Sequence, residues 1–235
     1  MFVIKYCLIK GESIYVKKLF VAIRQGNIQQ VKDILQKKPE LISCTAKQPP
    51  KKDDGQSPLQ VAIKSGNFII ADYLLDCDAD VNFIETESCN QWKMPVIQDA
   101  IMATIMNTRF LRFTYKNGEK VWEIYRTKEQ FDMAFRILKR MFDLGADINS
   151  HDSYGNSCLG RAILDARQIL PTIHYQDPTW VDERPLNNEL KEDLTLIFNL
   201  LLEQGADVNE VDRKIGNKSL AEFYKKECVA QFFVK

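Results

Sequence analysis

The strongest constraint on the fold is a sequence pattern that recurs along the chain. In its clearest copy, residues 57–67 read SPLQVAIKSGN, a pair of leucines follows at 74–75, and residues 79–82 read ADVN. Later copies end on GADIN at 145–149 and on GADVN at 205–209. An internal repeat of this kind indicates an architecture in which each unit packs against its neighbours in the chain.

Each copy predicts two helices and a polar loop. Ser57 can cap a helix whose first turn accepts Pro58, because a proline at that position loses no hydrogen bond. Apolar residues then recur at spacings of three and four, which places them on one helical face: Leu59, Ala62 and Ile63. Gly66 permits the turn that ends this first helix, and a second helix carries the paired leucines toward the same core.

The pattern resembles the ankyrin repeat, which runs D-x-x-G-x-T-P-L-H-x-A-A-x-x-G, continues with paired leucines and ends on G-A-D-V-N. This resemblance predicts one all-α domain over residues 1–235, a solenoid of about four full repeats plus a C-terminal cap. The repeats fall at 15–46, 53–82, 94–149 and 152–209, with the cap at 212–235. The first repeat departs from the pattern, since Pro39 and Glu40 replace its Ala-Asp ending.

Repeats three and four contain insertions between their two helices. The stretch from Ile97 to Asp147 is more than twice as long as its counterpart from Leu59 to Asp80. The first insertion, 110–125, has two alternating runs around Asn117-Gly118, which predicts a β-hairpin. The second, 171–188, contains three prolines and predicts an irregular ordered loop. Insertions at equivalent places in adjacent repeats should lie side by side.

Composition excludes several classes of protein. The 32 Lys plus Arg balance the 32 Asp plus Glu, so no overall charge favours nucleic acid or an anionic membrane. Six cysteines lie far apart without a C-x-x-C pair, which indicates free thiols in a reducing compartment. The apolar run 1–9 is strand-like, but a charge interrupts it and no cleavage site follows. We therefore expect a cytoplasmic protein without a membrane span.

The chain shows no pattern typical of a catalytic, metal or cofactor site. His151 and His174 have no acidic neighbours at metal or triad spacing. Cys158 lies close to His151 in the sequence, but it occupies a helix start and should be buried as a small hydrophobe. Acidic residues of the loops should be solvated: Asp53, Asp54, Glu85 and Glu87. We predict no cofactor, no metal and no catalytic residue.

The resemblance implies a non-catalytic module that binds a protein partner through its loops and first helices. The predicted partner-binding residues are Lys51, Lys52, Asp53, Gln56, Gln91, Trp92, Lys93, Arg112, Trp122, Tyr125, His151, Tyr154, Asn156, Tyr175, Trp180, Arg213 and Lys214. Weaker candidates on the first helices are Gln60, Lys64, Gln98 and Arg161. By analogy with small ankyrin proteins, the protein would be an inhibitor, an immunity factor or an effector that occludes its target.

A second function class is a small-ligand-binding protein or an enzyme whose site the two insertions form. The sequence leaves open whether the insertions bind a partner or only cover the scaffold. It also leaves open the partner, the pathway and the oligomeric state, although it favours a monomer.

Overall fold

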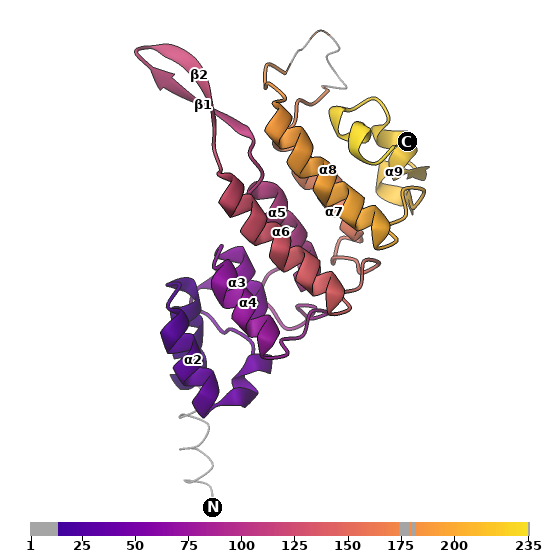
Figure 1. Ribbon diagram of the computed structural model, residues 1–235. Coiled ribbons are helices and arrows are strands. Elements are labelled where there is room, and N and C mark those ends of the chain that lie inside the picture. Colours follow the sequence, from indigo (N-terminus) through magenta and orange to yellow (C-terminus); the bar gives the residue numbers. More distant parts are fainter. Residues whose placement is uncertain (1–13, 174–178, 180–181, 235) are drawn as a thin grey trace, which may run out of the picture.

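The computed structural model describes residues 14–173, 179 and 182–234 as pairs of helices stacked in chain order (Figure 1). Residues 14–24 are helical and precede α2. The helices are α2 (Ile28–Lys37), α3 (Pro58–Lys64), α4 (Phe68–Asp76), α5 (Val96–Met106), α6 (Lys128–Asp143), α7 (Cys158–Ala166), α8 (Asn188–Glu203) and α9 (Leu220–Tyr224). Short 3-10 helices are η1 (Pro39–Ser43), η2 (Lys51–Asp53), η3 (Arg213–Ile215) and η4 (Cys228–Phe232).

The helices form two layers. One layer consists of α3, α5 and α7, which pack in that order, and the other consists of α2, α4, α6 and α8. Within each pair, α3 packs on α4, α5 on α6 and α7 on α8. One apolar core runs through the whole stack, and small side chains allow the first helices to approach closely: Ala62, Ala100 and Ala162 are all buried.

The predicted helix starts are confirmed. The Ser57 hydroxyl accepts a hydrogen bond from the Gln60 backbone N–H at 3.1 Å, and Ser157 caps α7 in the same way. Cys158 stands at the first position of α7, as Pro58 does in α3. The thiol of Cys158 is buried, as expected, and burial raises its pKa to about 12.

The predicted β-hairpin is present between α5 and α6. Strands β1 (Leu111–Lys116) and β2 (Glu119–Ile124) pair antiparallel, with Leu111 opposite Ile124. Asn117 and Gly118 join them with φ values of 53° and 85°, as a two-residue hairpin turn requires. The hairpin projects from the helix stack (Figure 1).

The description of the chain as all-α with one hairpin needs a correction in the C-terminal segment. There, β3 (Val211–Asp212) and β4 (Lys218–Ser219) form a second short antiparallel pair. The turn between them is possible because Gly216 and Asn217 both adopt a positive φ. Two-residue strands are too short for alternation to predict them from the sequence.

Some predictions fall on residues outside the described ranges. These are the strand-like run 1–9 and, in the second insertion, His174, Tyr175 and Trp180. Of the described residues of that segment, 171–173, 179 and 182–187 lie outside helices and strands, and Asn188 begins α8. Among the helices of the described residues, none has the length and apolar composition that crossing a membrane requires.

Candidate protein-interaction surfaces

The base of the hairpin is fixed to α8 by one arginine. The Arg109 guanidinium binds Asp193, with Nη2 2.8 Å from Oδ1 and Nε 3.1 Å from Oδ2. The Arg109 backbone N–H donates to the same carboxylate at 2.8 Å, and its carbonyl accepts from Asn187. The hydrogen bonds to Asp193 raise the pKa of Arg109 above its ordinary value. The hairpin therefore starts from a rigid point.

One face of the hairpin is aromatic and exposed. Because side chains alternate along a strand and paired residues share a face, the register collects on it Leu111, Phe113, Tyr115, Lys120, Trp122 and Ile124. Phe113 lies edge-on to Trp122, with ring centroids 5.6 Å apart, and also contacts Tyr115. Tyr115 is 70% exposed and Phe113 46% exposed.

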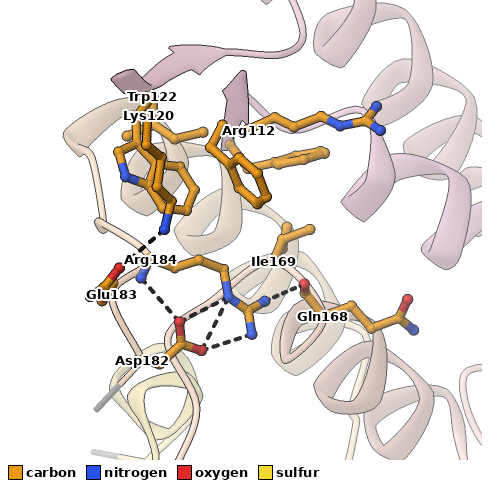
Figure 2. A pocket seen from close by; sticks show the side chains of 11 residues that line it. Arg112, Lys120, Trp122, Gln168, Ile169, Asp182, Glu183 and Arg184 are labelled. Carbon is orange, nitrogen blue, oxygen red and sulfur yellow. Dashed lines mark hydrogen bonds and ion pairs between the residues drawn. The ribbon is translucent and has the colours of Figure 1, made fainter. Parts of the chain in front are cut away.

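The aromatic face lies beside residues 182–184 of the segment predicted to be the second insertion. The Lys120 ammonium is 3.1 Å from the Glu183 carboxylate and about 5 Å from the rings of Phe113 and Trp122. Figure 2 shows these groups around a cavity of about 720 Å³. The expectation that the two inserted segments are spatial neighbours is thus confirmed for their described residues.

Except for Arg112, whose side chain is directed away from Asp182 and Arg184, the charged groups of the cavity wall already have partners. Arg184 forms an ion pair with Asp182 at 2.7 Å and also donates to the Gln168 carbonyl (Figure 2). Burial alone would raise the pKa of the Asp182 carboxyl, but the Arg184 hydrogen bonds outweigh it and lower that pKa. The cavity therefore offers aromatic surface rather than free charge.

The loops at the other end of α5 form a second cluster, around Trp92. Its indole N–H donates to the Asp152 carboxylate at 2.9 Å, and the Arg161 guanidinium lies over its ring at 5.1 Å. Asp152 also accepts hydrogen bonds from Tyr154 and Asn156. Burial would raise the pKa of Asp152, but these hydrogen bonds prevail and lower it. Trp92 thus joins the loop before α5 to the loop before α7.

The other predicted loop residues are distributed along this same end of the stack. His151 and Lys214 connect neighbouring loops, since His151 is 2.8 Å from Glu210 and Lys214 donates to Asn156. Lys93 donates to the Thr86 carbonyl at 2.6 Å. The remaining members of the set are exposed, as the prediction requires: Lys51, Lys52, Gln91 and Arg213.

Asp53 and Gln56, predicted to contact a partner, are buried instead. Asp53 is 4% exposed and forms an ion pair with Arg24 at 2.9 Å, and Gln56 is 1% exposed and donates to Glu85 at 3.4 Å. Glu85 is buried as well, so the expectation of solvated charge is wrong for it and for Asp53. The residues of each pair are 29 positions apart in the sequence. They connect neighbouring segments of the helix stack rather than face a partner.

Three of the weaker candidates on the first helices are also buried. Gln60 donates to the Met94 carbonyl at 3.2 Å, and Gln98 donates to the Asn156 carbonyl at 2.8 Å. Arg161 is held by Asp165 of the same helix. The two glutamines therefore fix the next loop along the stack, and of this group Lys64 alone keeps a partly exposed side chain.

The remaining predicted hairpin residues divide between its faces. Trp122 lies on the aromatic face, whereas Arg112 and Tyr125 lie on the opposite one, and Figure 2 shows the Arg112 side chain directed away from Asp182 and Arg184. Of the residues that line the cavity, sequence reasoning singled out Arg112 and Trp122 as site residues and missed the others, among them Phe113, Lys120, Asp182 and Arg184. For Phe113, the signal was available, because an Asn-Gly turn sets it opposite Trp122.

Residues 54–83 match the family model of the ankyrin repeat. This match covers α3, α4 and the loops that flank them, and it coincides with the second predicted repeat. It supports an ankyrin-type helical repeat and, with it, the general role of such repeats in protein interaction. A comparison with curated proteins finds no match for the chain.

The described residues contain no disulfide and no metal cluster. Their cysteines are free thiols: Cys44, Cys77, Cys89, Cys158 and Cys228. Within the same residues, no group of three or more His, Cys, Asp or Glu side chains is arranged to hold a metal ion.

Proposed function

We propose that the protein is a non-catalytic protein-binding module whose main contact surface is the aromatic face of the hairpin. One observation carries the proposal: exposed aromatic side chains project from the helix stack on a hairpin that Arg109 fixes at its base. Aromatic residues are enriched among binding hot spots, and a preformed surface avoids the entropy cost of ordering on binding.

The helix pairs support a reading as four ankyrin repeats and a cap, of which the family match covers one. In this reading the hairpin and the 171–188 segment are insertions in repeats three and four. The Trp92 cluster then belongs to the loop edge that ankyrin proteins commonly use, and it forms a secondary contact surface. An inhibitor, immunity factor or effector acting in the cytoplasm as a monomer fits this arrangement, because occlusion of a target needs surface and no chemistry.

The test is a comparison of wild-type protein with a Phe113→Ala/Tyr115→Ala variant as bait in affinity capture. Each captured protein is then purified and mixed with the full chain, and size-exclusion chromatography determines the stoichiometry of the complex. A stoichiometric complex that the double variant forms at least tenfold more weakly supports the proposal. A partner bound equally well by both proteins contradicts the assignment of the surface. A Val211→Ala variant, exposed at the opposite end of the stack, serves as control.

A second candidate is a small-ligand site, because the two inserted segments enclose the cavity of about 720 Å³. Arg184 already pairs with Asp182, and Lys120 already pairs with Glu183. A charged ligand that bound either cation would break an existing ion pair, which argues against such a ligand. Mass spectrometry of freshly purified protein under native and denaturing conditions separates the two candidates. A stoichiometric small molecule released on denaturation favours the second.

A further inference from the structure

Two guanidinium groups on the opposite face of the hairpin lack an acidic partner. Arg112 and Arg126 both lie against the Tyr125 ring, 4.9 Å and 4.5 Å from its centroid. Arg126 donates a hydrogen bond of 3.4 Å to the Met106 carbonyl. Among the described residues, neither arginine forms an ion pair with a carboxylate.

This arrangement differs from that of the other cations nearby. Lys116 pairs with Glu123, Lys120 with Glu183 and Lys128 with Asp132. Planar guanidinium groups bind carboxylates in a bidentate manner. The two arginines are therefore able to bind a carboxylate from outside the chain without breaking an existing ion pair.

Arg126 also lines a groove of about 640 Å³ that runs between α3, α5 and α6. Three half-buried methionines give the groove an apolar wall: Met102, Met106 and Met133. Methionine is flexible and polarizable, so such a wall adapts to different apolar side chains.

The groove has little negative charge to offset the arginines. Its acidic lining residue among the described ones is Asp99, which is fully buried and lies 4.0 Å from the Lys64 ammonium. Burial raises the pKa of Asp99 to about 7, despite Lys64 and Gln60, which lower it. The surface thus combines an apolar groove with Arg126, an arginine without a carboxylate partner among the described residues, in its wall.

We propose that this groove and the Arg112–Arg126 pair form a docking site for an acidic segment of a partner protein, with an apolar side chain beside its carboxylates. The proposal rests on the proposed protein-binding function and adds the chemistry of the bound segment. The carboxylate would bind the two guanidinium groups, and the apolar side chain would enter the methionine-lined groove. Neither Phe113 nor Trp122 lines the groove, whereas Arg112 also lines the cavity beside those two residues. The single variant Arg126→Gln therefore separates the two surfaces.

The test uses the full chain and a random library of displayed dodecapeptides as the probe. Peptides are selected on the wild-type protein, synthesised with a fluorophore and titrated by fluorescence anisotropy. The test variant is Arg112→Gln/Arg126→Gln, and the matched control is Lys116→Gln/Lys128→Gln. Both remove two positive charges from the hairpin and α6 region, but the control lysines already have acidic partners. Urea denaturation of both variants shows that they remain folded.

We expect the selected peptides to be enriched in Asp or Glu next to Leu, Met, Ile or Phe. The arginine variant should bind them at least tenfold more weakly and the lysine control less than twofold more weakly, since charge-assisted hydrogen bonds are lost only in the former. Selection without acidic enrichment, or equal affinity for both variants, overturns the docking site. Displacement by millimolar inorganic phosphate also overturns it, in favour of a phosphate site.

Failure here is distinguishable from failure of the proposed function. If binding of the peptides survives in the arginine variant but is lost in Phe113→Ala/Tyr115→Ala, the protein-binding function stands and the docking site is wrong. If no peptide is enriched, the docking site is overturned, and the proposed function is judged by whether a protein partner forms a stoichiometric complex.

Discussion

Arg109 and Asp193 form a bidentate ion pair that joins the base of the hairpin to α8, although the sequence separates them by 84 positions. The Asp193 carboxylate is fully buried, and the Arg109 side chain is 15% exposed. Because the carboxylate also binds the Arg109 backbone N–H, one side chain fixes both the direction of the chain and the position of the guanidinium. The hairpin can therefore present its aromatic face in one orientation.

Replacing the acidic member of this pair should destabilise the fold. Asp193→Ala leaves a largely buried guanidinium and a backbone N–H without their acceptor, so the free energy of unfolding should fall by about 3 kcal/mol. Urea denaturation measures this change. The control is Lys128→Ala, which breaks an exposed pair and should cost less than about 0.5 kcal/mol. An Asp193→Ala variant as stable as this control would show that the pair contributes little.

Much of the fold could be predicted because its signals are local. A capping serine, apolar residues on one helical face and a glycine that ends the helix recur within a few residues of each other. An Asn-Gly pair between two alternating runs predicts the hairpin. The burial of Asp53 and Glu85 was not predicted, because their partners, Arg24 and Gln56, lie 29 positions away in the sequence. No pattern in the adjacent residues indicates that these carboxylates are buried. Arg109 was missed for the same reason. In the candidate site, the Asn-Gly turn was enough to predict the hairpin that carries Trp122 and to set Phe113 opposite it, although Phe113 was not singled out. The position of Arg109 depends on Asp193, 84 positions away, and could not be predicted.

Acidic substitutions of the small helix-contact residues test the repeat register. Ala62→Asp and Ala162→Asp each place an unpaired charge where the wild-type side chain is fully buried, so each should lower the free energy of unfolding by about 4 kcal/mol. Chemical denaturation midpoints check this. Ile69→Asp, on an exposed position of α4, is the matched control and should cost less than about 1 kcal/mol. Unchanged midpoints for both alanine variants would mean that the register is wrong.

Asp99 should make stability depend on pH. Burial raises its pKa from 3.8 to about 7 in the folded protein, so between these values the folded state keeps a proton that the unfolded state has released. The contribution of this group to the free energy of unfolding therefore falls as the pH rises from about 4 to about 7. The Asp99→Asn variant has no carboxyl at this position, so its free energy of unfolding should not show this decrease. Between pH 4 and pH 8, its free energy of unfolding should therefore rise relative to that of wild type by on the order of 1 to 4 kcal/mol.

Urea denaturation at several pH values measures the difference in the free energy of unfolding between wild type and Asp99→Asn. The contributions of Asp165 and of other groups present in both proteins cancel in this difference. Ile69→Ala, at an exposed position of α4, is the control and should differ from wild type by a nearly constant amount, because it removes no titratable group. A constant difference for Asp99→Asn as well would show that the Asp99 carboxyl is ionised in the folded protein.

The thiols should differ in reactivity with an alkylating reagent at neutral pH. Cys89 is exposed, and desolvation and a hydrogen bond with Asp54 raise its pKa, whereas Cys44 and Cys158 are less accessible and burial raises their pKa values to about 12. Since the thiolate is the reactive form, Cys89 should be modified at least about tenfold faster than these two. Peptide mass spectrometry over time gives the separate rates of these three cysteines. After denaturation without reductant, most of the six cysteines should react, and three intact bridges would reverse the assignment to a reducing compartment.

Shortening the hairpin should separate binding from stability. In the variant, 111–124 is replaced by a two-residue turn, which removes the aromatic face and retains Arg109 and its bonds to Asp193. Strands β1 and β2 mainly contact each other, and repeat proteins are stabilised by local and nearest-neighbour terms. The free energy of unfolding should therefore fall by no more than about 2 kcal/mol, while affinity for the captured partner is lost. If the inserted segments only cover the scaffold, the result is reversed: the melting temperature falls substantially and the folded fraction binds as wild type. Measuring both quantities on this one protein decides between the two roles, and retained affinity would contradict the one proposed here.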